Sequence, residues 1–353
     1  MFFSCDNIPV TYFIKERVRM NIYDIASLAG VSIATVSRVL NGSEKVSEKT
    51  RARVMAVIEK EQYSPNLFAR GLDQGTIHSV GIVVPDISDL YMSDCVSVLE
   101  KGLEKKGYSC ILACSGYDRK SKAAYVQMLL DKMVDALILV GSTYAGNGSD
   151  PEETEYIRTA AEKIPVFVVN GIVEGQNIYC NICNDRQAVY EASSLLISHG
   201  RKNILFLTNS GSYSALQKLQ GYKEALTRNR IPVKDEMILH LGDRIHAVRD
   251  YLLNTPLPVF DAVICAEDFL AVGAVKYAHA RGIRIPEDLE IIGYNNSSLA
   301  ISCEPELTSI NSRVEKLCTN TVDFLVRRLE TEEPVPQAAD FSGILTLRQS
   351  TLP

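Results

Sequence analysis

Short apolar runs alternate with helical patterns from residue 79 onward, and this alternation constrains the fold more than any other feature of the chain. Apolar runs of this length, separated by amphipathic segments, are typical of buried parallel strands joined by helices. The pattern occurs as two successive series, so we predict an α/β core of two similar lobes, each built on a doubly wound sheet. The predicted strands are SVGIVVPD, SCILAC, DALILVG and PVFVVNG in the first series, and NILFLTN, EMILHLG, DAVICAED and LEIIGYN in the second.

The predicted core carries none of the motifs that common enzymes use. It has no phosphate-binding loop, no dinucleotide fingerprint and no nucleophile–base constellation, and the five histidines lack the spacing of a metal site. Cys180 and Cys183 lie three residues apart in a predicted strand, which places their thiols on opposite faces. We therefore predict ordinary core cysteines, no metal, no cofactor and no enzymatic activity.

The composition predicts a cytoplasmic protein. Hydrophobic residues make up 46% of the chain and charged residues 23%, which is usual for globular domains, and no apolar run is long enough to span a membrane. The opening residues lack a signal-peptide pattern, so we expect the cysteines to remain reduced. Residues 20–75 carry seven basic and six acidic groups in a chain of net charge −6, so charge alone does not favour nucleic-acid binding.

A second strong pattern occupies residues 20–64, where two short amphipathic segments flank a tight turn. Asn21 is a good N-cap for the first segment, and Gly30 ends it where a left-handed residue is wanted. Ser32 then caps a second helix, and Ser47 caps a third whose apolar face completes a small core. The pattern predicts a helix-turn-helix domain with three helices.

The second of these helices keeps a mixed face outside the predicted core. Ser37, Arg38 and Asn41 supply hydrogen-bonding groups, while Ile33 and Ala34 can contact thymine methyl groups. An ordinary small helical bundle is the alternative, but such a bundle does not need this combination of caps, turn and polar face. We therefore predict that residues 20–64 bind DNA.

From Asn21 to Leu72, without gaps, the chain resembles the DNA-binding head of the lactose/galactose-repressor (LacI–GalR) family. Landmarks of the core, among them VGIVVPDISDLYMSD, GYKEAL and RGIRIPEDLEIIGYNN, are similar to the family's effector core, which resembles periplasmic binding proteins. The resemblance implies a transcriptional regulator, most often a repressor, that binds a pseudo-palindromic double-stranded DNA operator as a homodimer. Residues 1–19 fall outside it, and are either a disordered extension or the result of a start assigned upstream of Met20.

The resemblance also implies roles for individual residues of the head. The helix of residues 32–41 would lie in the major groove, with Ile33, Ala34 and Arg38 at the base edges. Residues 65–76 would be a linker and hinge helix that forms only on DNA, where Leu72 wedges between base steps of the minor groove. The remaining DNA contacts would come from Ile22, Tyr23, Ser32, Thr35, Ser37, Asn41, Ser47, Thr50 and Asn66.

Family members bind a small molecule between the lobes, and the resemblance implies a pocket of altered chemistry here. Lys218 stands where sugar-binding members have Arg, Asn295 where they have Asp, and Glu267 where they have Asn. Either Lys218 and Glu267 pair with each other across the cleft, or these groups bind a small polar, sugar-like effector. The candidate effector-binding residues are Asp86, Tyr91, Met92, Asn170, Lys218, Arg244, Glu267 and Asn295.

The family's chain crosses between the lobes three times, and the crossings are expected here near residues 174–180, 297–304 and 331–336. The expected lobes are residues 77–176 with 305–332, and residues 177–303 with 334–353.

Two features bear on assembly and control. The chain ends without the leucine-rich tail helix of tetrameric family members, which favours a dimer. The segments VPDIS, DLEIIG and RQST resemble the catabolite-control branch of the family. Control by a protein corepressor, with a vestigial small-molecule cleft, is therefore the alternative to a small effector.

Overall fold

The computed structural model describes residues 20–40, 43, 45–63, 76–147, 151–242, 244–331 and 333–353. These residues form two compact units, one within residues 1–77 and one over residues 78–353, which we call the head and the core unit. The predicted N-terminal extension, residues 65–75 of the predicted hinge, and the predicted DNA contacts Asn41, Asn66 and Leu72 lie outside the described residues.

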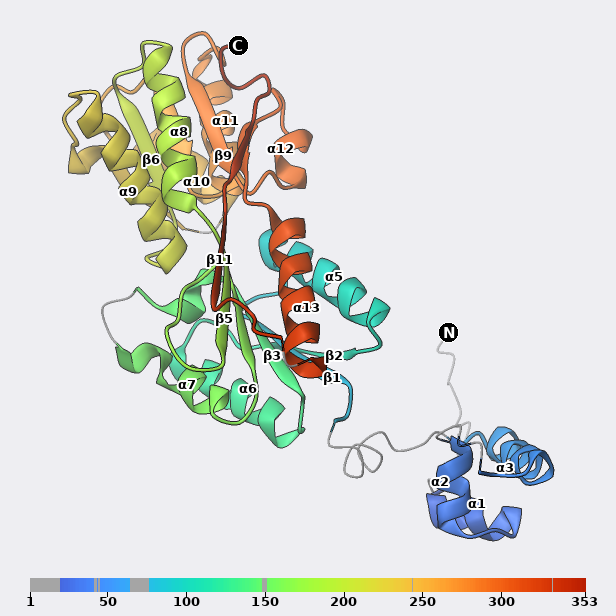
Figure 1. The fold of residues 1–353 in the computed structure, drawn as a ribbon. Coiled ribbons are helices and arrows are strands. Elements are labelled where there is room, and N and C mark those ends of the chain that lie inside the picture. Colours follow the sequence, from blue (N-terminus) through green and yellow to red (C-terminus); the bar gives the residue numbers. More distant parts are fainter. Residues whose placement is uncertain are drawn as a thin grey trace, which may run out of the picture. The chain divides into compact units, whose positions relative to one another are not determined.

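Three helices form the described part of the head (Figure 1): α1 (Ile22–Ala29), α2 (Ile33–Leu40) and α3 (Glu48–Glu61). The Asn21 side chain accepts a hydrogen bond from the Asp24 N–H (3.1 Å), and the Asp24 carboxylate accepts one from the Asn21 N–H (2.8 Å). This capping box begins α1. Gly30 ends the helix with φ of 60°, a left-handed conformation that glycine adopts readily.

The angle between α1 and α2 is 101°, which is typical of a helix-turn-helix. Apolar side chains from all three helices meet at the centre of the head, where Ile25, Val36 and Val54 are fully buried. The predicted helix-turn-helix and its third helix are therefore confirmed. Among the described residues, no single helix is both long and apolar enough to cross a membrane, and α1 and α2 reach that length and apolarity only when taken together across their bend.

Two six-stranded sheets form the core unit (Figure 1), with strand orders β11–β5–β4–β3–β1–β2 and β12–β10–β9–β8–β6–β7. Neighbouring strands pair in parallel, except for the antiparallel pair of β10 and β12. The two predicted doubly wound lobes are thus confirmed. The strands of the first sheet are β1 (Ser79–Val84), β2 (Ser109–Cys114), β3 (Ala136–Val140), β4 (Val166–Val169), β5 (Ile178–Cys183) and β11 (Ala338–Phe341). Those of the second sheet are β6 (Ile204–Thr208), β7 (Ile238–His240), β8 (Ala262–Cys265), β9 (Glu290–Tyr294), β10 (Thr308–Asn311) and β12 (Ile344–Thr346).

Helices cover both faces of the first sheet (Figure 1). One face packs against α5 (Leu90–Lys105) and α13 (Val314–Glu330), and the other against α6 (Arg119–Asp131) and α7 (Glu155–Ala161). Around the second sheet lie α8 (Asp185–Ser198), α9 (Tyr213–Arg228), α10 (Ile245–Asn254), α11 (Asp268–Arg281) and the short α12 (Ser298–Ser302).

Cys180 and Cys183 lie on opposite faces of β5, as predicted, because successive strand residues alternate between the faces of a sheet. Cys183 packs with the cluster under α5 and α13, and Cys180 packs with the cluster under α6 and α7. Both thiols are buried and free. Within the described residues, no group of three His, Cys, Asp or Glu side chains has the arrangement of a metal site.

The predicted crossings between the lobes are wrong. The last strand before each crossing still belongs to the sheet of the lobe that the chain is leaving, so each crossing lies later in the chain than predicted. β5 pairs with β4 in the first sheet, so the chain crosses after Cys183. β10 pairs with β9 in the second sheet, so the next crossing follows Asn311, and the last lies between Phe341 and Ile344. Lobe 1 is therefore residues 78–183 with 314–341, and lobe 2 is residues 185–311 with 344–353.

Candidate functional site

The outer face of α2 is open to solvent in the head. Ile33, Ala34 and Arg38 are exposed on this face, while Val36 and Val39 are buried on the opposite face. This is the amphipathic division that the sequence predicts for a helix that contacts a partner.

The other predicted DNA-contacting residues of the head differ in how free their side chains are. Tyr23 is 67% exposed. The hydroxyls of Ser32 and Thr35 lie 2.9 Å apart, and those of Ser47 and Thr50 also lie 2.9 Å apart, so both pairs are already hydrogen-bonded at helix starts. Ser37 is half-buried. Ile22 packs partly against the core of the head, so its side chain belongs more to the domain's interior than to its surface.

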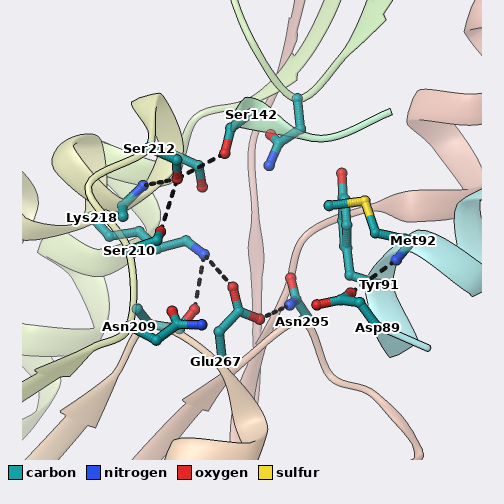
Figure 2. A pocket seen from close by; sticks show the side chains of 14 residues that line it. Asp89, Tyr91, Met92, Ser142, Asn209, Ser210, Ser212, Lys218, Glu267 and Asn295 are labelled. Atoms are coloured by element: carbon teal, nitrogen blue, oxygen red, sulfur yellow. Dashed lines mark hydrogen bonds and ion pairs between the residues drawn. The ribbon is translucent and has the colours of Figure 1, made fainter. Parts of the chain in front are cut away.

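A pocket lies between the two lobes of the core unit (Figure 2), beyond the carboxyl ends of strands from both sheets. Its volume is about 420 Å³, which includes space open to solvent. Lobe 1 contributes Asp89, Tyr91, Met92, Ser142 and Asn170 to its wall. Lobe 2 contributes Asn209, Ser210, Ser212, Ser214, Ala215, Lys218, Ala266, Glu267 and Asn295.

The structure brings together most of the predicted effector-binding residues. Those that line the pocket are Tyr91, Met92, Asn170, Lys218, Glu267 and Asn295. Asp86 and Arg244 do not line it. Asp86 is exposed and accepts hydrogen bonds from the Ser88 N–H (2.9 Å) and hydroxyl (2.8 Å), so it closes a local turn. Arg244 is exposed at the start of α10.

Sequence reasoning missed Asp89, which lies three residues beyond Asp86. Its carboxylate accepts a hydrogen bond from the Met92 N–H (3.0 Å) as the N-cap of α5. The signal was present, because Asp is a preferred N-cap before an amphipathic run. This signal predicts the helix start, but it does not reveal that Asp89 also lines a pocket. Ser212, the N-cap of α9, was missed for the same reason.

Lys218 on α9 is buried, with 3% of its surface exposed. Its ammonium donates a hydrogen bond to the Ala266 carbonyl oxygen (2.9 Å) and lies 3.6 Å from the centre of the Tyr294 ring. It also lies 3.7 Å from a carboxylate oxygen of Glu267. The expected pairing of Lys218 and Glu267 is therefore present, but both residues belong to lobe 2, so the pair does not span the cleft.

Glu267 follows β8 and faces the pocket, and 26% of its side chain is exposed. Its carboxylate accepts a hydrogen bond from the Asn295 side-chain amide (Figure 2). Burial raises the pKa of Glu267 to about 7, although the charge of Lys218 acts in the opposite direction. Burial also raises the pKa of Asp89, against the hydrogen bond from Met92.

Two buried carboxylates form a second layer behind the pocket wall. Asp185 accepts a hydrogen bond from the Tyr294 hydroxyl, which holds the ring against Lys218. Asp268 accepts hydrogen bonds from the N–H (2.7 Å) and hydroxyl (2.8 Å) of Ser297. A Cβ atom at Gly293 would lie 2.2 Å from an Asp268 oxygen, so the close approach of the carboxylate to β9 requires glycine.

One rim of the pocket is closed by direct contact between the lobes. The Ser142 hydroxyl of lobe 1 donates a hydrogen bond to the Ser212 hydroxyl of lobe 2 (3.0 Å), as Figure 2 shows. The backbone N–H of Tyr213 donates to the Gly146 carbonyl oxygen (3.0 Å), and the Tyr213 side chain packs against the apolar cluster of lobe 1. We call these interactions the rim contact.

Comparison with known proteins places the two units in one family. Residues 21–66 match the family described as bacterial regulatory proteins, lacI family, and residues 194–351 match a periplasmic binding protein-like domain. A relative from Lachnoclostridium phytofermentans, named HTH-type transcriptional regulator, is 45% identical over 335 residues, which is 94% of this chain and 99% of the relative. Catabolite control protein A of Priestia megaterium is 31% identical over 341 residues, which is 95% of this chain and 100% of that protein.

The fold is also that of a solved regulator. The structure of the lac repressor dimer bound to operator and the anti-inducer ONPF superposes with a TM-score of 0.83 at 24% identity, covering 95% of this chain and 99% of that one. The relatives match nearly their full length to both the head and the core unit. The chain therefore belongs to the lacI family of bacterial regulatory proteins.

Proposed function

We propose that this regulator acts in the cytoplasm as a repressor that binds a pseudo-palindromic DNA operator as a homodimer. The proposal rests on the exposed face of α2, where the side chains of Ile33, Ala34 and Arg38 are open to solvent and not part of the core of the head. A helix of this kind fits the major groove, where Arg bonds guanine and apolar groups contact thymine methyls. The solved lac repressor, which shares the fold, is a dimer bound to operator.

Replacement of Arg38 by Ala tests this proposal. Loss of one base-reading contact costs about 1–3 kcal/mol per subunit, so a dimer should lose roughly 30-fold or more in affinity for its operator. Fluorescence anisotropy, with competition by random DNA, measures this loss. Arg53→Ala removes an equal charge from the exposed side of α3, and should leave the preference for operator over random DNA intact. Retained operator preference in Arg38→Ala would contradict the assignment.

A small polar effector in the pocket is the second part of the proposal. The pocket is lined by amides, hydroxyls and carboxylates from both lobes, which are the groups that orient a small polar ligand. No reaction is assigned to it. A ligand at 100 times its dissociation constant stabilises the folded state by about 2.7 kcal/mol, so thermal unfolding of the full chain in the presence of a metabolite library reveals an effector.

Control by a protein corepressor is the alternative. Lys218, Glu267 and Asn295 bond to one another and to the Ala266 carbonyl, so much of one pocket wall is satisfied without a ligand. Catabolite control protein A is also among the relatives. This alternative predicts that no member of the library shifts the unfolding temperature of the core unit.

A further inference from the structure

Two carboxylates from opposite lobes are open to the pocket. Asp89 projects from the start of α5 in lobe 1, and Glu267 projects from the end of β8 in lobe 2. Figure 2 shows the two carboxylates on either side of Asn295. Asp89 is partly buried, and 26% of the Glu267 side chain is exposed, so a ligand in the pocket reaches both. A ligand would therefore meet a carboxyl group on each lobe.

Lys218 does not offset this charge for a ligand. Only 4% of its side chain is exposed, and its ammonium is directed to the Ala266 carbonyl, the Tyr294 ring and Glu267. Two further carboxylates, Asp185 and Asp268, lie behind the same wall and are buried. The charged groups around the pocket are thus mainly acidic, and the ammonium of Lys218 is already bound by groups of lobe 2.

Neutral polar groups make up most of the remaining wall. Ser142, Ser210, Ser212, Asn170 and Asn209 place hydroxyls and amides around the cavity. Tyr91 also lines the pocket, and its buried hydroxyl lies beside the Cys95 thiol. The wall therefore suits a ligand that carries several hydroxyl groups.

We infer that the pocket takes a polyhydroxylated amine whose ammonium lies between Asp89 and Glu267. This inference rests on the proposed small-effector function and names the chemical class of that effector. An ammonium compensates the two carboxylates, and hydroxyls bond to the serine and asparagine side chains. A phosphorylated or carboxylated sugar is disfavoured, because it would bring a further negative charge into a partly desolvated acidic site.

The titration of the site agrees with this assignment. Burial raises the pKa of Asp89 and raises that of Glu267 to about 7, and the charge of Lys218 offsets this rise only in part. Asp86, Asp185 and Asp268 oppose their ionisation, while Lys218 favours it. A bound ammonium favours the ionised forms. Affinity for an amine that stays protonated should therefore rise as the pH rises through about 7.

Calorimetric titration of the full chain with matched probes tests the inference. Each set consists of one parent sugar with its amine and its 6-phosphate: glucose, glucosamine and glucose 6-phosphate form the first set. The corresponding compounds of galactose and mannose form two further sets. We expect at least one amine to bind, at least about tenfold tighter than its neutral counterpart, because hydrogen bonds between charged groups are the stronger ones. We expect the phosphorylated members not to bind.

Substitutions then locate the preference within the site. Glu267→Gln and Asp89→Asn each remove one charge and retain an acceptor oxygen, and Asn also serves as an N-cap for α5. Each should weaken amine binding by about tenfold and change binding of the neutral sugar by less than about threefold. Asp86→Asn, which removes a nearby carboxylate outside the pocket wall, should change neither. Thermal unfolding of each variant verifies that the core unit is folded.

The outcomes separate the inference from the function on which it rests. Tighter binding of a neutral or phosphorylated member, or unchanged amine preference in both pocket variants, overturns the inference but leaves a small effector in place. Absence of binding by every amine also overturns it. If, in addition, no compound of the metabolite library stabilises the protein, the small-effector proposal fails as well. Control by a protein corepressor is then the favoured alternative.

Discussion

The head and the pocket place their polar side chains in opposite ways. The head presents them on the outer face of α2, with the apolar residues of the same helix directly beneath. The pocket collects them from strand ends and helix starts in both lobes, and surrounds them with buried carboxylates and an ammonium. A side chain on the outer face of α2 is therefore surrounded by water before it contacts a partner. A polar side chain of the pocket is surrounded by charged groups, and its interactions with a ligand depend on them.

This difference has an energetic side. Water screens the exposed groups of the head, so their interactions act over short distances and add nearly independently. In the pocket, Lys218 interacts with Glu267, Ala266 and Tyr294 at once, and a change in one partner alters the environment of the others. The units also differ in the size of their apolar cores, and the largest expected effect of a substitution follows from that.

Ile25→Ala should unfold the head and leave the core unit folded. Truncation of a fully buried Ile costs about 2–5 kcal/mol, which is most of the stability that a domain this small can have. Ile264→Ala makes the same change in the core of lobe 2, and should lower the stability of that unit without unfolding it. Circular dichroism and calorimetry of both variants measure this. A head that stays folded in Ile25→Ala would remove the contrast in stability between the units.

The pH dependence of stability should reveal the environment of Glu267. Its pKa rises from an ordinary 4.5 to about 7 in the folded core unit, so between these values the folded state holds the proton more tightly than the unfolded chain. Stability from this group is present below about pH 4.5 and is lost as the pH rises through about 7. We expect Glu267→Gln to remove about 1–2 kcal/mol of this dependence.

Urea unfolding at about pH 5.5 and pH 8 provides the comparison, because the Glu267 carboxyl of the folded state is mainly protonated at the first pH and mainly ionised at the second. The informative quantity is the difference between the two pH values, in wild type and variant. If wild type and variant showed equal differences, Glu267 would resemble an exposed carboxylate, and the electrostatic contrast between head and pocket would disappear.

The smallest expected effect concerns the rim contact. Ser142→Ala removes a hydroxyl that joins the lobes, and should favour the open arrangement of the ligand-free core unit by about 0.5–1.5 kcal/mol. Ser210→Ala removes a hydroxyl that lies 3.1 Å from the same Ser212 oxygen but within lobe 2, so it should not change the opening. Distances between spin labels, one on each lobe, measure the populations. If Ser142→Ala and Ser210→Ala showed the same population of the open arrangement, the Ser142 hydroxyl would not join the lobes.

The head could be predicted almost completely from the sequence, because its signals are local. The Asn21 capping box and Gly30 lie within nine residues of one another, and each specifies a helix end through its own backbone. The alternation of strands and helices likewise predicted both sheets. The lobe boundaries were wrong, since the pairing of β5 with β4 or of β10 with β9 depends on partners elsewhere in the chain.

The pocket could be predicted only in part. Lys218, Glu267 and Asn295 were identified through the family resemblance, but their pairing within one lobe depends on the positions of three separate elements. Asp86 and Asp89 both follow β1, and only the geometry of the turn decides that the first bonds to Ser88 while the second faces the pocket. Charge in the pocket is thus a property of tertiary structure.

The packing of Gly293 against Asp268 limits how this regulator can evolve or be redesigned. A side chain at position 293 would collide with the carboxylate that fixes the turn at Ser297, so the strand end leading to Asn295 tolerates little variation. The segment from Asn209 to Ser212 lines the same pocket, and a Cβ at Gly211 would meet no atom within 4 Å. New ligand preferences would therefore arise more readily from substitutions in that segment, which can change the hydroxyls offered to a ligand while Asp89 and Glu267 stay as they are.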